Sequence, residues 1–346
     1  MNDLFPANQG KKATIDDVAA LAKVSIKTVS RVFNAEPNVR PTTRDRVMAA
    51  ARELDYQPNL SARRLAAKRA FVIGLLYDNP QSDYIIAIQE GALQICRQYG
   101  YHILIHPCTE EPAGLVSEAV NLKSQGMVDG FLLSQPISEN AALIQALEQR
   151  NIPHVRISQR ALGGAPCISV NDEEAAARMT QHLIELGHTR IGFVMGHPDH
   201  GSSHDRHDGF QRAMAAAGLT VNPDWVEQGL YNFESGYSAG RRLLAAALRP
   251  TAIFACNDHM AMGVLTAAHE QGVTVPGQLS VCGFDDTPMA RYSWPPLTTS
   301  RQPIHQVALL AAEVLLKRIR NEAGGDQSHL LHCELVRRAS TGSAPG

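Results

Sequence analysis

The sequence predicts a small all-α helix-turn-helix head followed by an α/β core of two Rossmann-like lobes. Two observations predict this division of the 346-residue chain. Residues 11–69 contain thirteen lysines and arginines against six acidic residues, and because the whole chain has a net charge of −2, residues 70–346 carry a net charge of −8. From residue 70 onward, short apolar runs alternate with amphipathic segments, which is typical of parallel sheets joined by helices.

The composition indicates a folded protein and excludes several other classes. Hydrophobic residues make up 44% of the chain and charged residues 19%, which argues against a mostly disordered protein. No run approaches the roughly 18 consecutive apolar residues of a membrane helix, and the start, MNDLFPANQGKK, lacks the apolar core of a secretory signal. The six cysteines form no CxxC pair, which argues against a zinc ribbon and a disulfide scaffold. We therefore expect a cytoplasmic protein with no membrane partner.

Three short helices are expected in the head. The first begins at Thr14, whose hydroxyl forms a capping-box pattern with Asp17. The second follows a short break and has Ser25 as its expected cap. The third is expected to begin at a cap formed by Thr42 and to end before Pro58. Two short helices separated by three or four residues are typical of a helix-turn-helix motif.

The second helix presents a polar face on the side opposite its apolar stripe. Lys27, Thr28, Ser30 and Arg31 lie on this face. An arginine can donate two hydrogen bonds to the edge of guanine, and hydroxyls and helix-start amides suit phosphates. An ordinary basic, solvated helix is the alternative, but the caps, the turn spacing and the hydroxyls all agree with DNA binding.

The head also resembles a known family. Residues 14–34, TIDDVAALAKVSIKTVSRVFN, resemble the DNA-binding motif of the LacI/GalR family of bacterial transcription regulators, and residues 56–66, YQPNLSARRLA, resemble its hinge segment. The resemblance implies that Ile26, Lys27 and Arg31 read bases. It implies phosphate contacts for Thr14, Ser25, Thr28, Ser30 and Asn34. It also implies a minor-groove wedge at Leu65, flanked by Asn59 and Ala62.

The expected hinge helix is short enough to depend on its surroundings. It is shorter than the roughly 12–15 residues at which an isolated helix is marginal in water, so we expect it to fold only with DNA and a second hinge helix. A plain linker is the alternative. The expected divisions are a flexible tail (1–12), a helix-turn-helix domain (13–59), a hinge helix (60–69), a core (70–322, with lobe 1 about 70–170 plus 300–322 and lobe 2 about 171–297) and a C-terminal extension (323–346).

The core is expected to contain two sets of alternating strands and helices. The predicted strands are 71–77, 101–106, 130–134, 154–158, 190–195, 225–229, 252–255 and 279–284. The predicted helices are 85–99, 114–125, 140–150, 173–186, 206–217, 234–247, 258–271 and 306–322. Ligands of open α/β sheets bind at the carboxyl ends of the strands, so a cleft shared by the two lobes is the expected site. Gly187-His188, Asn257-Asp258, SVCGFDD (280–286) and PLTTSRQP (296–303) resemble landmarks of the same family, which implies a periplasmic-binding-protein-like core.

Polar residues near strand ends are the candidate effector ligands, because a ligand cleft needs a few placed polar groups. Asp285 follows a buried strand and can accept two hydroxyl donors. Asn257 ends another strand, with helix capping as its alternative role. Arg206 matches a cleft arginine of the family that hydrogen-bonds effector hydroxyls or carbonyls, with a helix-start cation as the alternative. The resemblance supplies the remaining candidates: Tyr84 and Tyr231, where aromatics pack on the effector, and Asp172 at the crossover between lobes.

One segment is unusually rich in histidine. Residues 197–208 contain His197, His200, His204 and His207, which could bind Zn²⁺ or Ni²⁺ or titrate near neutral pH. The segment follows a strand and is expected to be a cleft-lining loop, where polar residues occur anyway. Because structural metal sites usually show tighter paired spacing, we expect no metal here.

Together these observations predict a transcription repressor that responds to a small molecule. We expect a homodimer that binds a pseudo-palindromic operator and is released by a sugar-like effector in the cleft. A corepressor-dependent regulator that senses a nucleobase-like metabolite is the alternative, and a solute-binding protein is the rival from another class. The sequence has no G-x-S-x-G, GK[S/T], H-E-x-x-H or G-x-G-x-x-G motif where an enzyme would need one, so we expect neither catalysis nor a cofactor.

Overall fold

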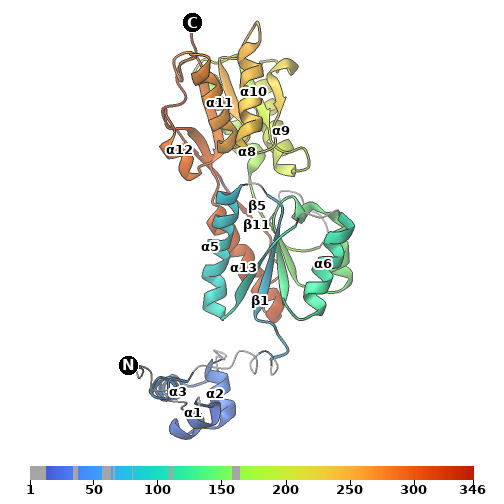
Figure 1. The fold of residues 1–346 in the computed structure, drawn as a ribbon, viewed down its shortest axis with the longest axis vertical. Helices are drawn as coiled ribbons and strands as arrows, with labels where there is room; N and C mark the ends of the chain where they lie inside the picture. Colours follow the sequence, from blue (N-terminus) through green and yellow to red (C-terminus); the bar gives the residue numbers. More distant parts are fainter. Residues whose placement is uncertain are drawn as a thin grey trace, which may run out of the picture. The chain divides into compact units, whose positions relative to one another are not determined.

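The computed structural model describes residues 13–33, 38–56, 64, 67–79, 81–108, 112–157 and 164–346. The contacts within the chain divide it into two compact units, Met1–Arg69 and Ala70–Gly346. The first unit contains the helical head and the second the α/β core, and Figure 1 shows the elements of each. The expected tail over residues 1–12 and most of the expected hinge helix lie outside the described residues.

The head is built around a small apolar core. Val18, Val29 and Val47 come from three different helices and are fully buried. Four residues separate the first two helices, and Lys23 turns the chain between them with a φ of +51°. This arrangement confirms the predicted helix-turn-helix. The helices are α1 (Ile15–Leu21), α2 (Ile26–Phe33) and α3 (Pro41–Glu53).

Two of the three predicted helix caps are present. Thr14 and Asp17 form a capping box, in which the Asp17 amide donates to the Thr14 hydroxyl and the Asp17 carboxylate accepts from the Thr14 amide. The Ser25 hydroxyl accepts the amide of Thr28 at the start of α2. The prediction for α3 was wrong, because its N-cap is Arg40 and no side chain caps it. Pro41 begins this helix instead, since its fixed φ suits the first turn and it has no amide hydrogen to satisfy.

The core contains two six-stranded sheets, which confirms the predicted two-lobed α/β fold. All strands of the first sheet run parallel, and in the second sheet only the last strand is antiparallel among the pairs described. In spatial order the first sheet is β11 (His329–Leu331), β5 (Cys167–Val170), β4 (His154–Ile157), β3 (Gly130–Leu133), β1 (Val72–Tyr77) and β2 (His102–Pro107). The second is β12 (Glu334–Val336), β10 (Thr298–Arg301), β9 (Ser280–Asp285), β8 (Ala252–Ala255), β6 (Ile191–Met195) and β7 (Val226–Gln228).

Helices cover the two sheets, and we call each sheet with its helices a lobe. The first lobe carries α5 (Ser82–Tyr99), η1 (Ile137–Glu139), α6 (Pro112–Ser124), α7 (Ala141–Gln149) and α13 (Ile304–Arg320). The second carries α8 (Asp172–Glu185), α9 (Gly201–Ala216), η2 (Pro223–Trp225), α10 (Phe233–Ala245), α11 (Asp258–Glu270) and α12 (Pro288–Tyr292). Within the lobes α5 packs on α13, α8 on α9 and α10 on α11 (Figure 1). None of these described helices is long and apolar enough to cross a membrane.

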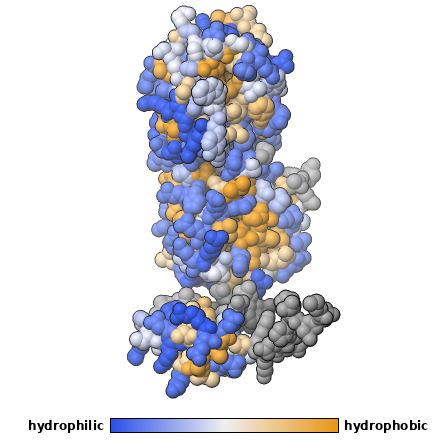
Figure 2. Space-filling view, turned by 60° about the vertical axis from the view of Figure 1, so that its left-hand side comes forward, coloured by the Kyte–Doolittle hydropathy of each residue, from blue (hydrophilic) through white to orange (hydrophobic). Residues whose placement is uncertain are grey.

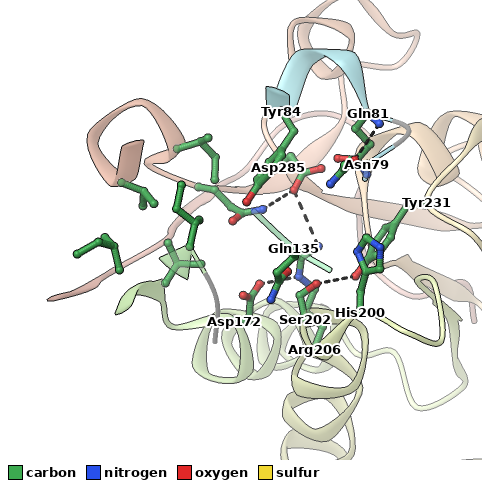
Figure 3. A pocket seen from close by; sticks show the side chains of 16 residues that line it. Asn79, Gln81, Tyr84, Gln135, Asp172, His200, Ser202, Arg206, Tyr231 and Asp285 are labelled. Atoms are coloured by element: carbon green, nitrogen blue, oxygen red, sulfur yellow. Dashed lines mark hydrogen bonds and ion pairs between the residues drawn. The ribbon is translucent and has the colours of Figure 1, made fainter. Parts of the chain in front are cut away.

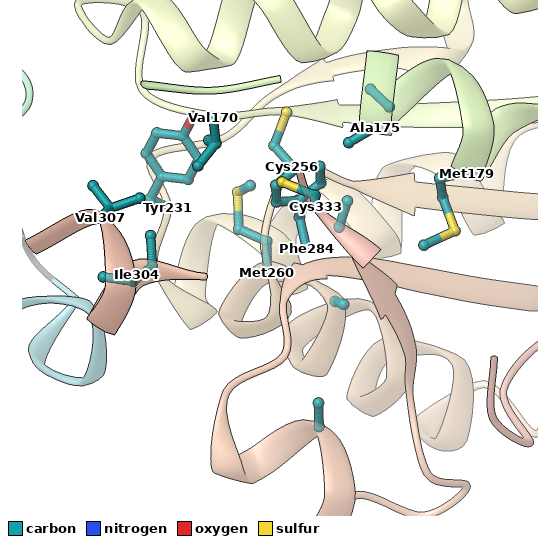
Figure 4. Close-up of a cluster of buried hydrophobic side chains, with 14 of the residues drawn as sticks. Val170, Ala175, Met179, Tyr231, Cys256, Met260, Phe284, Ile304, Val307 and Cys333 are labelled. Atoms are coloured by element: carbon teal, nitrogen blue, oxygen red, sulfur yellow. The ribbon is translucent and has the colours of Figure 1, made fainter. Parts of the chain in front are cut away.

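A continuous apolar core joins the lobes. Val170 of β5 and Phe284 of β9 belong to one buried cluster, together with Cys256, which directly follows β8 (Figure 4). Helices α8 and α9 pack closely in the second lobe. Gly209 of α9 permits this, because a Cβ at this position would lie 2.1 Å from the Glu173 carbonyl oxygen on α8. Figure 2 shows that hydrophilic side chains cover much of one face of the core, while hydrophobic side chains gather in one area on the first lobe.

The C-terminal segment differs from the sequence expectation. Residues 323–346 were expected to extend beyond the core, but they supply β11 to the first sheet and β12 to the second. Strands β5 and β10 were not predicted either. The C-terminal segment therefore passes from one lobe to the other and belongs to both.

Candidate functional site

The outward face of α2 carries the side chains that the sequence singled out for DNA. Ile26 is 47% exposed, which is unusual for isoleucine, and Lys27 and Arg31 are exposed beside it. Thr28 and Ser30 are half-buried. Because Val29 and Val32 hold the other face of α2 in the head core, the polar face is fixed toward solvent. A rigid helix with an exposed, cationic start suits insertion into a major groove.

Some candidate DNA residues have local structural roles as well. The Thr14 hydroxyl donates to the Asp17 carboxylate at 2.7 Å, and the hydroxyls of Ser25 and Thr28 lie 2.9 Å apart. These bonds hold helix starts in place. The other candidates in this group lie outside the described residues, namely Asn34, Asn59, Ala62 and Leu65.

A pocket lies where the two lobes meet. Its lining comes from the carboxyl ends of strands in both sheets, as predicted for a shared cleft. Five of the six predicted effector residues line it (Figure 3): Tyr84, Asp172, Arg206, Tyr231 and Asp285. The other lining residues are Asn79, Gln81, Gln135, Ile157, Ile168, Val170, His200, Ser202, Gln302, Ile304 and Val307.

Arg206 lies at the centre of the polar side of this pocket. Its Nε donates to Asp172 Oδ1 at 2.6 Å, and its Nη1 donates to the Cys256 carbonyl at 2.6 Å. Nη1 also lies 3.9 Å from Asp285 Oδ1. The guanidinium carbon is 3.7 Å from the centre of the Phe284 ring, which supports it from one face. Arg206 is therefore fixed on four sides rather than held as a loose helix-start cation.

Asp285 is the most unusual residue of the pocket. Its backbone φ of +116° is rare for a residue with a side chain, and such strain is often found at functional sites. Its Oδ1 accepts from Gln302 Nε2 at 2.6 Å, but its Oδ2 is buried with no hydrogen-bond partner among the described residues. Burial raises the pKa of Asp285 to about 7, although Arg206 acts in the opposite direction. A ligand donor would supply the partner that Oδ2 lacks.

Asn257, the sixth predicted effector residue, is not among the residues that line this pocket. Its Oδ1 caps α11 by accepting the amide of Met260 at 2.9 Å. Its Nδ2 donates to the carbonyl of Tyr231 at 2.9 Å. Both ends of the amide are therefore used, and the alternative role of helix capping is the one observed.

Sequence reasoning missed several polar residues of the pocket. Gln135 follows β3 and Gln302 follows β10, so both occupy the strand-end positions that were used to find the acids. Ser202 donates or accepts a hydrogen bond at 3.0 Å with the Tyr231 hydroxyl. The signal for Gln302 was present in PLTTSRQP, but this segment was not recognised as a strand.

The histidine segment is mostly helical rather than a loop. Helix α9 begins at Gly201, so His204 and His207 lie within it. His200 lines the pocket beside Tyr231, and burial lowers its pKa to about 4, which leaves it neutral near pH 7. His207 packs against Phe193 in the core. Across the described parts of the chain, no group of three or more histidine, cysteine or acidic side chains is placed to hold a metal ion.

Comparison with known proteins identifies both parts of the chain. Residues 14–59 match the family described as bacterial regulatory proteins, lacI family, and residues 180–341 match the periplasmic binding protein-like domain. The repressor PurR of Haemophilus influenzae (strain PittEE) is 33% identical over 319 residues, which cover 92% of this chain and 94% of the relative. PurR of Klebsiella pneumoniae (strain 342) is 35% identical over 335 residues, covering 96% and 98%.

Solved structures agree with this result over nearly the whole chain. The lac repressor dimer bound to operator and the anti-inducer ONPF superposes with a TM-score of 0.76 at 28% identity, covering 96% of this chain and 100% of that one. The CelR–cellobiose complex gives 0.71 at 29% identity, covering 95% and 99%. Because relatives that are 33–35% identical match more than nine-tenths of the chain, this chain belongs to the LacI family of bacterial regulatory proteins and is a DNA-binding transcriptional repressor.

Proposed function

We propose that a small sugar-like effector binds in the pocket between the lobes and releases this repressor from its operator. The observation that carries this proposal is the group formed by Asp172, Arg206 and Asp285, in which Asp285 Oδ2 is buried with no hydrogen-bond partner in the described part of the chain. The group lies at the junction of the lobes, so a ligand that binds it favours one arrangement of the lobes over another. Such a ligand changes DNA affinity only if it binds the two arrangements with different affinity.

The chemistry of the lining favours a polyhydroxyl ligand. Carboxylates accept hydroxyl hydrogens, while the amides of Gln81 and Gln135 both donate and accept. Tyr84 and Tyr231 add aromatic surface. Sugars present alternating donors and acceptors around an apolar ring face, which suits this mixture. The structural neighbour CelR, solved with cellobiose, supports the same class of ligand.

We further propose that the chain acts as a homodimer on a pseudo-palindromic operator. Two reading helices spaced by a two-fold axis match two half-sites. The lac repressor neighbour was solved as a dimer on operator. In this chain Tyr292 is 84% exposed and Trp294 is 92% exposed, although large aromatic side chains are usually at least partly covered. A contact between two subunits would cover this exposed pair, which is why we include it in the proposal of a dimer.

A nucleobase-related corepressor is the second candidate for the effector. The relatives named PurR favour it, because they are 33–35% identical to this chain whereas CelR is 29% identical. Such a ligand would strengthen operator binding instead of weakening it. A solute-binding protein would not need the helix-turn-helix head, and the relatives matched over nearly the whole chain are repressors and not enzymes.

The two candidates are separated by one experiment. A preferred duplex is first selected from a random pool with the full chain, and its affinity is then measured by fluorescence anisotropy with sugars or nucleobases present. A sugar that weakens binding supports the proposal, and a nucleobase that strengthens it supports the second candidate. Asp285→Ala and Arg206→Ala should abolish either response while operator affinity without effector stays intact. An unchanged response in both variants places the ligand elsewhere.

A further inference from the structure

The pocket is poor in positive charge that a ligand could use. Among its described lining residues, Arg206 is the only arginine or lysine. Its Nε and Nη1 already donate to Asp172 and to the Cys256 carbonyl, and Phe284 covers one face of the guanidinium. A phosphate or carboxylate ligand needs charged donors in a fork or cluster. To use Arg206, such an anion would have to compete with Asp172.

His200 does not supply the missing charge. It lies in the lining next to Tyr231 and is buried. Burial, with Arg206 and His197 acting in the same direction, lowers its pKa to about 4. Near neutral pH His200 therefore offers a neutral imidazole, which is a weak partner for an anion.

Negative charge surrounds the same space. Asp172 lines the pocket, and Asp285 adds a second charge above its pKa of about 7. Glu139 is near enough to raise the pKa of Tyr84, and Asp83 is near enough to raise that of Asp285. Glu139 is held in place by the Gly201 amide at 3.0 Å. Several carboxylates thus act on a pocket that has one guanidinium. An anionic ligand would meet repulsion in a site shielded from water.

Above the Asp285 pKa of about 7, where this group is a carboxylate, the unused hydrogen-bonding capacity of the pocket is that of an acceptor. Asp285 is more than nine-tenths buried by its side chain, and Oδ2 has no partner in the described chain. Gln302 fixes the other oxygen, so the carboxylate is oriented before a ligand arrives. A hydroxyl or N–H donor is the group that this position is built to receive.

We propose that the pocket takes an effector without a phosphate or carboxylate group, which donates a hydroxyl or N–H hydrogen to Asp285 Oδ2. The inference rests on the proposed function, in that it concerns the same pocket, but it excludes a class of compound that the fold alone would admit. Phosphosugars, sugar acids and nucleotides are rejected. Free sugars and free nucleobases remain.

The test compares matched neutral and anionic probes on the full chain at pH 8, where Asp285 is ionised. The probes are D-glucose with D-glucose 6-phosphate, D-ribose with D-ribose 5-phosphate, cellobiose with cellobionate, and free purine bases with their nucleoside monophosphates. Thermal shift finds the binders and calorimetry gives their affinities, since a ligand of the folded state raises its melting temperature. We expect at least one neutral probe to bind, with its anionic partner at least roughly tenfold weaker. An anionic probe that binds as tightly as its neutral partner, or a panel with no neutral binder, overturns the inference.

A variant assigns the selectivity to the residue. At pH 8, above the Asp285 pKa of about 7, Asp285→Asn should weaken binding of the neutral probe and reduce the neutral-to-anionic affinity ratio, because it removes one repelling charge and keeps the side chain's shape. Asp224→Asn removes a charge at an exposed position of η2 and serves as the control, with the ratio unchanged. Retained operator binding by Asp285→Asn shows that the variant is folded. A ratio that stays the same in Asp285→Asn contradicts the role given to this carboxylate.

Failure of this inference is distinguishable from failure of the proposed function. Binding of the probe is read by calorimetry, and operator release is read by anisotropy on the same samples. An anionic probe that binds and releases operator overturns the inference and supports the proposed function. A neutral probe that binds, with its anionic partner much weaker, but leaves operator affinity unchanged supports the inference and overturns the proposed function.

Discussion

Asp285 carries both a strained backbone and a carboxyl group that resists ionisation. Its φ is +116°, and burial raises its pKa from 3.8 to about 7. Arg206 and Gln302 partly offset the cost of this burial. A residue kept under such conditions reduces the stability of the free protein, and the reduction is recovered when a ligand donates to it.

The raised pKa predicts how stability depends on pH. Between about pH 4 and 7 the folded protein keeps the Asp285 proton while the unfolded chain releases it, so this group makes the free energy of unfolding fall as pH rises through that window. In the wild-type protein this group should lower the free energy of unfolding by on the order of 2–4 kcal/mol between pH 4 and 8. The Asp285→Asn protein has no proton to lose at this position, so it should lack this decrease. Urea denaturation of both proteins at several pH values measures this. Parallel stability profiles for the two proteins would contradict the raised pKa.

Arg31 provides a prediction for the head. It lies exposed on α2, one turn beyond Lys27. Arg31→Ala should cost about 1–3 kcal/mol of operator affinity at one base position and little at the others. Competition binding against single-base operator variants measures the cost, with Lys23→Ala in the turn as a control on the same unit. An equal loss on every sequence would mean that Arg31 contacts only phosphate.

At single residues, sequence reasoning succeeded where the strand ends were recognised. Asp285 was found in this way, whereas Tyr231 came from the family resemblance. Asn257 was assigned to the ligand because a strand-end amide can bind a ligand or cap a helix with the same atoms. The choice depends on where the next helix points, which periodicity does not give. Gln302 was missed because its strand was missed.

The start of α9 forms a link between the lobes. Glu139, in η1 of the first lobe, accepts the amide of Gly201 at the first turn of α9 in the second lobe. A carboxylate is favourable at a helix N-terminus. A Cβ at position 201 would lie 2.7 Å and 2.8 Å from the two carboxylate oxygens, so only glycine permits this approach. Gln135 donates to the other oxygen at 2.9 Å and orients it.

Breaking this contact between Glu139 and Gly201 should weaken effector binding while the protein stays folded. Gly201→Ala forces Glu139 away from α9, and we expect roughly a fivefold or greater loss of effector affinity. The melting temperature should not fall by much, because alanine suits a helix better than glycine does. Calorimetry with the neutral probe found above measures the affinity. Gly277→Ala, at an exposed position, is the matched control, and equal affinities for the two variants would contradict the link.

The elements that sequence reasoning missed share a physical cause. Strand β10 reads Thr-Thr-Ser-Arg, yet Thr298 and Thr299 are fully buried. The Thr299 hydroxyl donates to the buried Asp258 carboxylate at 2.6 Å, so polar contacts replace the apolar pattern that identifies strands. Strands β11 and β12 have three residues each, too few to show any period. The long apolar strands and periodic helices were found within a few residues of their observed bounds.

The exposed aromatic pair predicts the assembly of the whole molecule. Trp294→Asp should weaken the homodimer, because a charge would be buried against apolar surface in the subunit contact. Operator affinity should then fall, since two linked heads bind two half-sites more tightly than one head binds one. Sedimentation velocity measures the mass. Leu248→Asp, at a residue 58% exposed, is the control, and a Trp294→Asp protein that stays dimeric would place the interface elsewhere.

The central claim is that the pocket and the reading head share one equilibrium. Reciprocity of binding free energies makes this measurable, because an effector that changes operator affinity by some factor must have its own affinity changed by operator by the same factor. The decisive measurement determines both factors for the neutral effector, by anisotropy with labelled operator and by calorimetry with and without operator. We predict equal factors of roughly 5–150 in the wild-type protein and a factor of one in Asp285→Asn. An effector that binds the wild-type pocket while leaving operator affinity unchanged would contradict the account.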